Sequence, residues 1–357
     1  MENLSNLSDI FSDPNHTFVI AEVGSNWKVG SKKNDLKMAK KLIEVASKAG
    51  VDAVKFQTYK PQTVYVENAG QINYLNKSST KNINEIFSEL SMPYEMLPEL
   101  RDFCQKNNVV FMSTPFSVED AVNVDKFVDI HKIASYEINH IRLLEFVSKT
   151  GKPVLISTGA STYKEIDFAV ELMKKNTTKI GLFQCTSKYP TPLDSLNLAV
   201  IPHMKIRYNV PIGLSDHSTD PIIGPLVAIG MGATFIEKHF TLDRNLPGPD
   251  HAFALTPNEL KEMTNAIRKA DAAKGNGEKT VLPEEEELYK FATRSVQAIK
   301  NISKGEILQE GINIDVLRPG KQKRGLEARY LFDVLNKKAI KDIKSGQGIT
   351  YDDYERN

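Results

Sequence analysis

The chain has 357 residues, of which 41% are hydrophobic and 25% are charged, and its formal net charge at pH 7 is +1. This composition is typical of a soluble globular protein, and the balanced charge gives no sign of the basic face expected of a nucleic-acid-binding protein. The chain has only two cysteines and no apolar run of signal-peptide or membrane-spanning length, so we expect a cytoplasmic protein without nucleic-acid or membrane partners.

Short apolar segments alternate with helix-like segments along residues 18–273. Eight segments are expected strands, at residues 18–24, 53–58, 109–116, 130–137, 153–159, 180–187, 211–214 and 233–236. The helix-like segments lie at residues 36–50, 91–107, 118–128, 141–150, 163–176, 193–207, 221–232 and 257–273, with a break expected at Pro202. Residues 59–90 are rich in Asn, Ser and Lys and are expected to form a long irregular loop, which in a compact domain is usually functional.

Strand–helix alternation predicts a parallel sheet, and eight units fit a closed (β/α)₈ TIM barrel better than an open doubly wound sheet. No GxGxxG or Walker-type loop opens any of the helices. The barrel is expected to span residues 1–275, with a polar linker at 276–293. A small β-rich domain is expected at 294–357, where residues 298–308 (AIKNISKGEIL) recur as residues 339–349 (AIKDIKSGQGI). This echo predicts pseudo-twofold symmetry.

Polar side chains gather toward the carboxyl ends of the expected strands, where the active site of a TIM barrel lies. They are Glu22, Lys55, Gln57, Ser113, Thr114, Lys132, Ser135, Glu137, Ser157, Thr158, Gln184, Thr186, Ser187, Tyr189, Ser215, His217, Glu237 and His239. Lys55 and Lys132 lie inside apolar segments, where an unpaired charge is costly. A dianionic ligand would satisfy both lysines, with neighbouring hydroxyls bonding its oxygens; a structural ion-pair network is the alternative.

Two histidines follow the last two expected strands and are candidate metal ligands. On adjacent strands, His217 and His239 would lie about one strand spacing apart. Two imidazoles with room for oxygen ligands suit a divalent ion such as manganese, with magnesium and cobalt as alternatives. Glu237 falls on the same strand face as His239 and could be a ligand or an outer-shell partner.

The ordered motifs IAEVGSN, AVKFQT, STPF, HKIASYE, STG, CTSKYPTP, GLSDHS, EKHFT, GPDH and LRPG resemble those of the sialic acid (nonulosonic acid) synthases. The resemblance runs from about residue 18 to residue 354, and the carboxy-terminal segment resembles the antifreeze-like SAF domain of that family. It implies a transferase that condenses phosphoenolpyruvate with an open-chain acylaminohexose to give a nine-carbon 2-keto acid and phosphate. The acceptor would be N-acetylmannosamine, its 6-phosphate or a diacetamido-dideoxyhexose.

The resemblance also implies a role for each matching residue. Phosphoenolpyruvate would be held by Lys55, Thr114 and Ser135 at its carboxylate and by Lys132, Ser157, Ser187 and Ser215 around its phosphate. The residues that match the substrate-facing positions are Glu22, Gln57, Glu137, Tyr189, Glu237, Asp250 and Arg318. His217 and His239 match the manganese ligands; Glu22 and then Glu137 are the acid–base candidates. Arg318 would reach the sugar site of a partner subunit, which implies a domain-swapped homodimer.

Two positions depart from the family pattern. The common Asn-His pair after the first strand is Asn26-Trp27 here, in a slightly longer loop, and Ser187 stands where the family often has Asn. Two other functions remain open. One is a condensing synthase for aldose phosphates, which does not need the carboxy-terminal domain. The other is a catalytically silent sugar- or metal-binding protein, against which the retained lysines, histidines and Glu22 argue.

Overall fold

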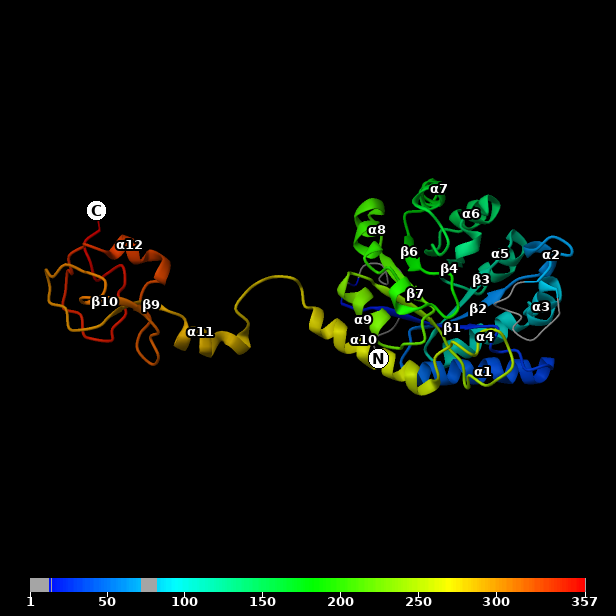
Figure 1. Cartoon of the computed structure of the whole chain (residues 1–357), viewed down its shortest axis with the longest axis horizontal. Coiled ribbons are helices and arrows are strands. Elements are labelled where there is room, and N and C mark those ends of the chain that lie inside the picture. Colours follow the sequence, from blue (N-terminus) through cyan, green and yellow to red (C-terminus); the bar gives the residue numbers. More distant parts are fainter. Residues whose placement is uncertain (1–12, 14, 72–81, 357) are drawn as a thin grey trace. The chain divides into compact units, whose positions relative to one another are not determined.

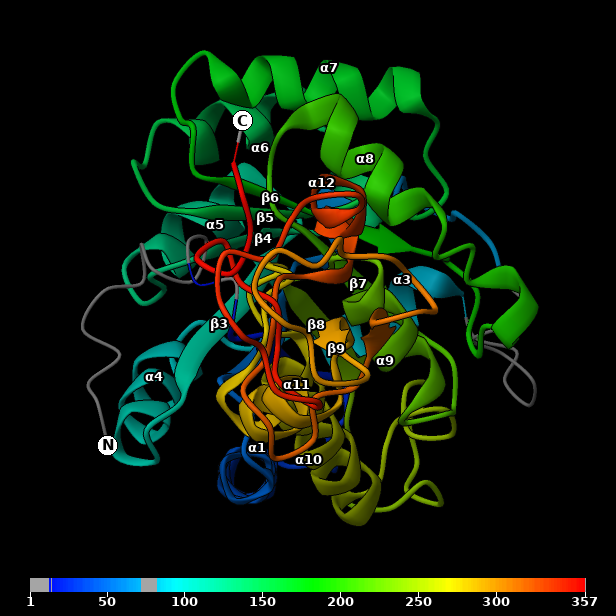
Figure 2. The ribbon, with the colours of Figure 1, turned by 90° about the vertical axis from the view of Figure 1, so that its left-hand side faces the viewer.

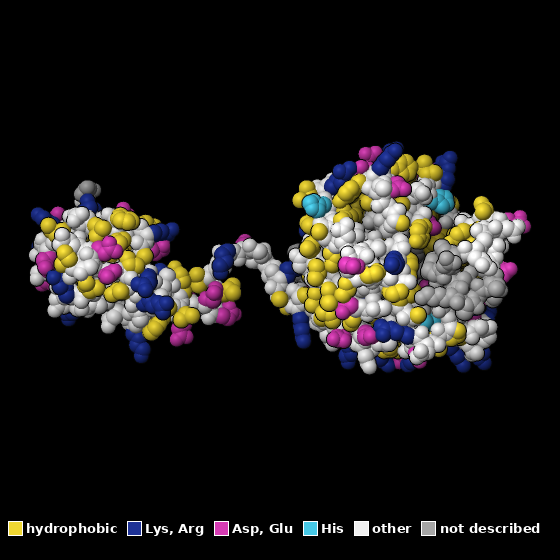
Figure 3. Space-filling view, viewed as in Figure 1, with side chains coloured by type: hydrophobic (Ala, Val, Ile, Leu, Met, Phe, Trp, Pro, Cys, Tyr) yellow, Lys and Arg dark blue, Asp and Glu magenta, His cyan; other side chains and the backbone are white. Residues whose placement is uncertain are grey.

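The structure is a computed structural model that describes residue 13, residues 15–71 and residues 82–356. The chain forms two compact units, Met1–Asn276 and Gly277–Asn357 (Figure 1). In the described part of the chain, no helix is both long and apolar enough to cross a membrane. Figure 3 shows acidic and basic side chains intermixed on the visible face of both units, in line with the balanced charge of the sequence.

The first unit contains eight parallel strands in the order β3-β2-β1-β8-β7-β6-β5-β4. They are β1 (Phe18–Gly24), β2 (Ala53–Thr58), β3 (Val110–Pro115), β4 (His131–Ile133), β5 (Val154–Ser157), β6 (Ile180–Cys185), β7 (Ile212–Asp216) and β8 (Phe235–His239). The two ends of this order, β3 and β4, lie side by side, which nearly closes the sheet into a ring. The predicted TIM barrel is confirmed.

Helices surround this ring (Figure 2). They are α1 (Lys32–Ala49), α2 (Pro61–Val64), α3 (Ile83–Leu90), α4 (Met96–Lys106), α5 (Val118–Asp125), α6 (Ile141–Ser148), α7 (Tyr163–Lys174), α8 (Val200–Tyr208), α9 (Ile223–Gly230) and α10 (Pro257–Lys274), with 3₁₀ turns η2 (Ser135–Glu137) and η3 (Leu193–Ser195). The sequence fixes several helix starts. At α10, Thr256 and Glu259 form a capping box and Pro257 occupies the first turn, both favourable at a helix start.

The barrel interior is layered along each strand. Its lower layer is apolar and includes Phe18, Ala53, Leu155, Phe183 and Phe235. Side chains two positions further along a strand lie on the same face, so the next layer toward the carboxyl ends carries polar groups such as Lys55, Ser157 and Glu237. The outward-facing residues of the same strands pack against the helices. The apolar layer therefore forms the floor under the polar one.

Three local expectations were wrong. The fourth strand ends at Ile133, and the residues after it form the turn η2. Pro202 does not break its segment, because it falls in the first turn of α8, where a proline costs no helical hydrogen bond. Residues 59–90 are not wholly irregular, since they include α2 and α3; the central part of this segment, residues 72–81, lies outside the described residues.

The second unit is a small β-rich fold with its own core. Its elements are η4 (Pro283–Glu285), α11 (Glu286–Ala292), β9 (Ser295–Ala298), β10 (Ile314–Leu317), η5 (Ala328–Tyr330) and α12 (Leu331–Val334), with β9 and β10 antiparallel. The repeated segments pair reciprocally: Ile302 and Ile343 exchange backbone hydrogen bonds. The amides of Gly305 and Gly346 donate to the carbonyls of Ala339 and Ala298, respectively. These equivalent hydrogen bonds show the pseudo-twofold symmetry that the sequence repeat predicts.

Candidate active site

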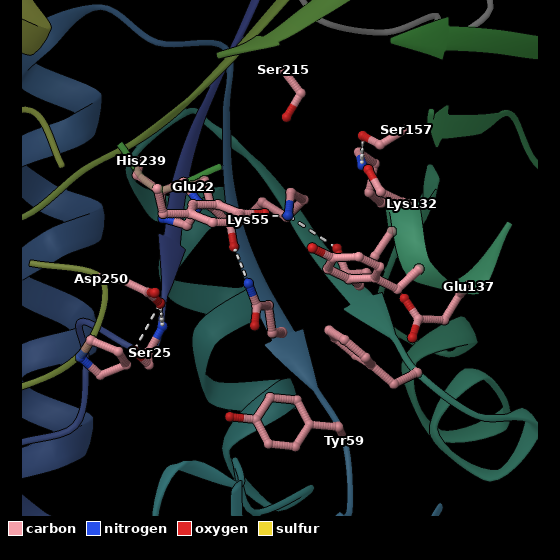
Figure 4. Close-up of a pocket in the computed structure, with 18 of the residues that line it drawn as sticks. Glu22, Ser25, Lys55, Tyr59, Lys132, Glu137, Ser157, Ser215, His239 and Asp250 are labelled. Carbon is pink, nitrogen blue, oxygen red and sulfur yellow. Dashed lines mark hydrogen bonds and ion pairs between the residues drawn. The ribbon is translucent and has the colours of Figure 1, made fainter. Parts of the chain in front are cut away.

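A cavity of about 470 Å³ opens at the carboxyl ends of the barrel strands (Figure 4). The structure brings almost all predicted site residues to its wall: Glu22, Lys55, Gln57, Thr114, Lys132, Ser135, Glu137, Ser157, Tyr189, Ser215, His217, Glu237, His239 and Asp250. They come from all eight strands or from the segments that follow them. One cavity therefore collects side chains that are spread over more than 220 residues of sequence.

Lys55 is held by acidic and hydroxyl partners in the centre of the cavity. Its Nζ forms an ion pair with Glu22 Oε2 and donates to Thr114 Oγ1 at 3.0 Å, while Glu237 Oε2 lies 3.8 Å away. Gln57 Nε2 donates to the other oxygen of Glu22 at 2.8 Å. β1 and β2 pair Glu22 with Lys55 in register, so the strand ladder itself sets this contact.

Lys132 is the second lysine of the cavity and lies next to a serine hydroxyl. Its Nζ donates to Ser157 Oγ at 2.5 Å and to the carbonyl of Ile133 at 3.2 Å. Glu237 Oε1 lies 3.9 Å from Lys132 Nζ and accepts from Ser215 Oγ at 3.0 Å. Glu237 thus lies between Lys55 and Lys132. The two lysines belong to an ion-pair network and also face the open cavity. The structure is therefore compatible in part with each predicted role, an ion-pair network or the binding of a dianionic ligand.

Burial and neighbouring charges shift the pKa values of the lysines and carboxyl groups of the site in opposite directions. Burial alone would raise the pKa of Glu237, but Lys132 and Lys55 hold it below its ordinary value. Burial lowers the pKa of Lys132, whereas Glu22 and Glu237 keep the pKa of Lys55 raised despite its burial. Burial raises the pKa of Glu22, and Lys55 opposes this effect only in part. Glu237 is therefore the firmly ionised carboxylate of the site, and Glu22 takes up a proton more readily.

The two histidines lie next to each other, with ring centroids 5.4 Å apart. His217 Nδ1 lies 2.9 Å from the carbonyl oxygen of Thr186; a carbonyl only accepts, so Nδ1 carries a proton and Nε2 is the nitrogen that could face a ligand. Burial lowers the pKa of His217, but Cys185 and the Thr186 carbonyl raise it above its ordinary value. Burial lowers the pKa of His239 to about 3, which keeps this imidazole neutral. Its buried Nδ1 has no hydrogen-bond partner among the described residues.

The adjacent imidazoles fit a divalent metal ion, because an imidazole oriented by a second hydrogen bond, as His217 is by Thr186, is a typical ligand. The described residues contain no group of three or more His, Cys, Asp or Glu side chains placed to hold a metal. The remaining ligands would have to be oxygens of substrate and water, as expected of an open catalytic site rather than a structural one. The residues present therefore fit the predicted metal.

Glu137 and Asp250 occupy other parts of the wall (Figure 4). Burial raises the pKa of Glu137 to about 8, so this carboxyl keeps its proton at neutral pH. Asp250 Oδ2 accepts from both the amide and the hydroxyl of Ser25, at 3.0 and 2.8 Å. Gly24 leaves room for Asp250: its φ is +56°, and an added Cβ would lie 2.6 Å from Asp250 Oδ2.

Five predicted positions of the first unit do not line the cavity: Ser113, Thr158, Gln184, Thr186 and Ser187. Ser187 lies behind Gly159, whose added Cβ would come within 2.2 Å of the serine hydroxyl. Gln184 donates instead to the carbonyl of Leu196. Arg318 follows β10 in the second unit, and its contact with a partner's sugar site stays a prediction. Trp27, where the sequence departs from the family, is a buried core residue rather than a wall residue.

Sequence reasoning missed two parts of the wall. Cys185 lies there, with Sγ 3.9 Å from His217 Nδ1; it follows Phe183 by two positions, so strand alternation could have indicated it. The second missed part is apolar and comes largely from the insertion after β2: Tyr59, Val64, Tyr65, Ile86, Phe87 and Leu90. No periodic signal in residues 59–90 indicated this surface.

Comparison with known proteins matches both units. The NeuB family model matches residues 42–279 and the SAF domain model residues 293–355. Pseudaminic acid synthase of Campylobacter jejuni is 35% identical over 97% of this chain and 98% of its own length. The crystal structure of spore coat polysaccharide biosynthesis protein SpsE from Bacillus subtilis covers 96% of both chains with 35% identity and a TM-score of 0.62. N-acetylneuraminic acid synthetase from Leptospira borgpetersenii, in complex with citrate, covers 79% of this chain and 93% of its own at 32% identity, with a TM-score of 0.70.

Proposed function

The chain belongs to the NeuB family of nonulosonic acid synthases and is a transferase of the condensing type, and we propose that it joins phosphoenolpyruvate to an open-chain acylaminohexose. The products are a nine-carbon 2-keto acid and inorganic phosphate. The observation that carries this proposal is the meeting of Lys55, Lys132, His217 and His239 in one cavity lined by carboxyl groups. The relatives are named for pseudaminic, legionaminic and sialic acid products.

The two lysines support phosphoenolpyruvate as the donor. This substrate carries a carboxylate and a phosphate, and the cavity offers two separate cationic points with hydroxyls next to each: Thr114 beside Lys55, and Ser157 beside Lys132. Charge-assisted hydrogen bonds of this kind bind anionic oxygens strongly. A bound dianion would also compensate the cost of burying both ammonium groups.

His217 and His239 would hold a divalent ion, most simply Mn²⁺, with Mg²⁺ or Co²⁺ as alternatives. When bound, such an ion supplies Lewis-acid polarisation of the acceptor aldehyde. The chain's own part is to orient His217 through the contact of its Nδ1 with Thr186 and to keep His239 neutral through burial. Tyr189 packs against the His217 ring at a centroid distance of 4.2 Å and limits its rotation.

The carboxyl groups account for the proton transfers. Carbon three of phosphoenolpyruvate attacks the aldehyde carbon, and protonated Glu137 donates its proton to the aldehyde oxygen, which becomes a hydroxyl. Glu237 stabilises the positive charge left at carbon two. Water adds at that carbon while Glu22 takes one of its protons. The resulting tetrahedral centre expels phosphate by cleavage of its C–O bond, and the departing phosphate oxygen takes the proton of the remaining hydroxyl. The new carbon–oxygen double bond is the 2-keto group.

Two measurements test this proposal. Phosphate release from phosphoenolpyruvate should require an acylaminohexose and should stop when a chelator is added. With ¹⁸O in the bridging position of phosphoenolpyruvate, C–O cleavage should leave the label in phosphate, as read by mass spectrometry. Label retained in the keto acid, or release that is independent of any sugar, would contradict the proposed reaction.

A further inference from the structure

The two candidate metal ligands are held in different ways. His217 is anchored by the hydrogen bond from its Nδ1 to the carbonyl oxygen of Thr186. The Nδ1 atom of His239 is buried and has no such partner among the described residues. Since His239 lines the cavity, its Nε2 is left as the nitrogen that can face a ligand. An imidazole without an anchoring hydrogen bond turns freely about its last side-chain bond, so another contact has to fix the direction of this Nε2.

Aromatic rings supply that contact. Phe253 packs against the His239 ring edge to face, with centroids 4.9 Å apart and an angle of 65° between the ring planes. Tyr189 makes a second edge-to-face contact with His239, at 6.2 Å and 83°. The rings of Tyr189 and Phe253 also pack on each other, with centroids 5.4 Å apart. Ring pairs of this geometry stabilise beyond the area they bury, so the three rings form one packed group.

Phe253 differs from Tyr189 in its access to the cavity. Tyr189 lines the wall and also packs on His217, whereas Phe253 is not one of the described wall residues. Only 6% of the surface of Phe253 is exposed. Phe253 is therefore placed to act on a bound metal through the His239 ring and not by direct contact.

The backbone after β8 holds Phe253 beside His239. The amide of Leu255 donates to the carbonyl of His239 at 2.8 Å. The carbonyl of Ala254 accepts from Arg244 Nε at 2.9 Å. Both hydrogen bonds lie within two residues of Phe253, and the first ties this segment directly to the histidine. The phenyl ring and the imidazole are therefore carried by one hydrogen-bonded piece of backbone.

We propose that Phe253 is a positioning residue for the metal: its ring keeps the His239 imidazole turned so that Nε2 of His239 and Nε2 of His217 can bind one divalent ion. This inference rests on the metal of the proposed function. Ring packing here takes the place of the hydrogen bond that normally orients a metal-binding histidine. Without the phenyl ring, His239 would spend only part of its time in the binding orientation, and the apparent affinity for the ion would fall by that fraction.

Removal of the ring tests this role. Phe253→Ala should weaken binding of Mn²⁺ to the full-length protein by about tenfold or more, the loss expected when the partner that orients a metal ligand is removed. Phe253→Leu, which keeps much of the apolar volume without the ring, should also bind Mn²⁺ more weakly and serves if the alanine variant does not fold. Phe253→Tyr keeps the ring and should restore binding. Electron paramagnetic resonance measures the dissociation constant without substrates, so the result does not depend on turnover.

Phe111→Ala is the matched control, because Phe111 is a buried ring of β3 that packs in the core between strands and helices. It should lose stability toward urea, as Phe253→Ala should, but keep the wild-type affinity for Mn²⁺. Wild-type affinity in Phe253→Ala or Phe253→Leu, or equal losses in Phe253→Ala and Phe111→Ala, would overturn the inference and leave the proposed metal standing. Failure of the wild type to bind Mn²⁺, Mg²⁺ or Co²⁺ would contradict the metal of the proposed function itself.

Discussion

Lys238 Nζ lies 2.5 Å from Asp216 Oδ2, and both side chains are fully buried. The two residues are register partners on β8 and β7, and each is followed directly by one of the two candidate metal-binding histidines. Lys238 Nζ also donates to Ser218 Oγ and to the carbonyl of Asp220, at 3.0 and 2.6 Å. This ion pair therefore fixes the carboxyl ends of the two strands and the turn that follows His217.

Replacing Lys238 by methionine should destabilise the barrel by roughly 3–5 kcal/mol, because Asp216 would keep a buried charge without a partner. Trp27 is the only tryptophan and is buried in the barrel core, so its fluorescence during urea unfolding reports on this unit alone. The double variant Lys238→Met/Asp216→Asn should recover part of the loss, since it removes the unpaired charge. A loss below about 1 kcal/mol for Lys238→Met would contradict the structural role of the pair.

His217→Ala should abolish binding of Mn²⁺ and the turnover that depends on it, because it removes one of the two proposed protein ligands. Binding of Mn²⁺ is measured directly by electron paramagnetic resonance on the full-length protein. His140→Ala, at the start of α6 and outside the cavity wall, is the control and should bind as wild type. Wild-type Mn²⁺ affinity in the His217 variant would exclude this residue as a ligand.

Lys132→Met should weaken binding of phosphoenolpyruvate by about a hundredfold or more, the cost expected when one partner of a buried charged pair is removed. Calorimetric titration without sugar isolates this binding step. Lys152→Met removes a lysine that pairs with Asp125 away from the cavity and should leave the affinity unchanged. An unaltered affinity in the Lys132 variant would favour a purely structural ion-pair network.

Glu137→Gln should change the pH dependence of stability. The pKa of Glu137 is raised by burial from 4.5 to about 8, so the folded chain holds this proton over a range where the unfolded chain has released it. The stabilising contribution is complete below pH 4.5 and is lost as the pH rises through 8. From pH 4.5 to pH 8, the free energy of unfolding of the wild type should fall by roughly 3–5 kcal/mol relative to the variant.

The exposed substitution Glu262→Gln on α10 is the control for Glu137→Gln and should show no such trend. Urea unfolding followed by Trp27 fluorescence at several pH values measures both variants. A difference between wild type and Glu137→Gln that stays constant with pH would show that this carboxyl ionises normally in the folded protein.

Arg318→Ala should leave the fold intact and weaken use of the sugar if the residue reaches the site of a partner subunit. Mixed dimers give the sharpest test. Dimers that combine one Arg318→Ala chain with one His217→Ala chain contain one complete site in a domain-swapped arrangement and none otherwise. Co-expression should then restore about a quarter of the wild-type activity if chains pair at random; activity no higher than that of the single variants would contradict the swap.

The sequence by itself determined the barrel architecture and the family of this protein, and it indicated most of the polar side chains that line the cavity. Eight apolar segments with polar ends give parallel strands, and side-chain alternation puts Lys55, Glu237 and His239 on the inner face because the repeat of a strand is fixed at two residues. The repeat likewise predicted the reciprocal backbone hydrogen bonds of Ile302 and Ile343, since two segments of similar sequence can adopt the same conformation and pair symmetrically.

The tertiary structure alone decided which polar groups meet and how they share charge. Glu237 lies between Lys55 and Lys132, and a neighbour's charge changes a pKa only through distance and burial; no local pattern encodes either. The aromatic side of the cavity also appeared only in the fold, because its rings Tyr59, Phe87 and Phe116 are 28 and 29 residues apart along the chain. They become one surface only when the barrel brings these parts of the chain together.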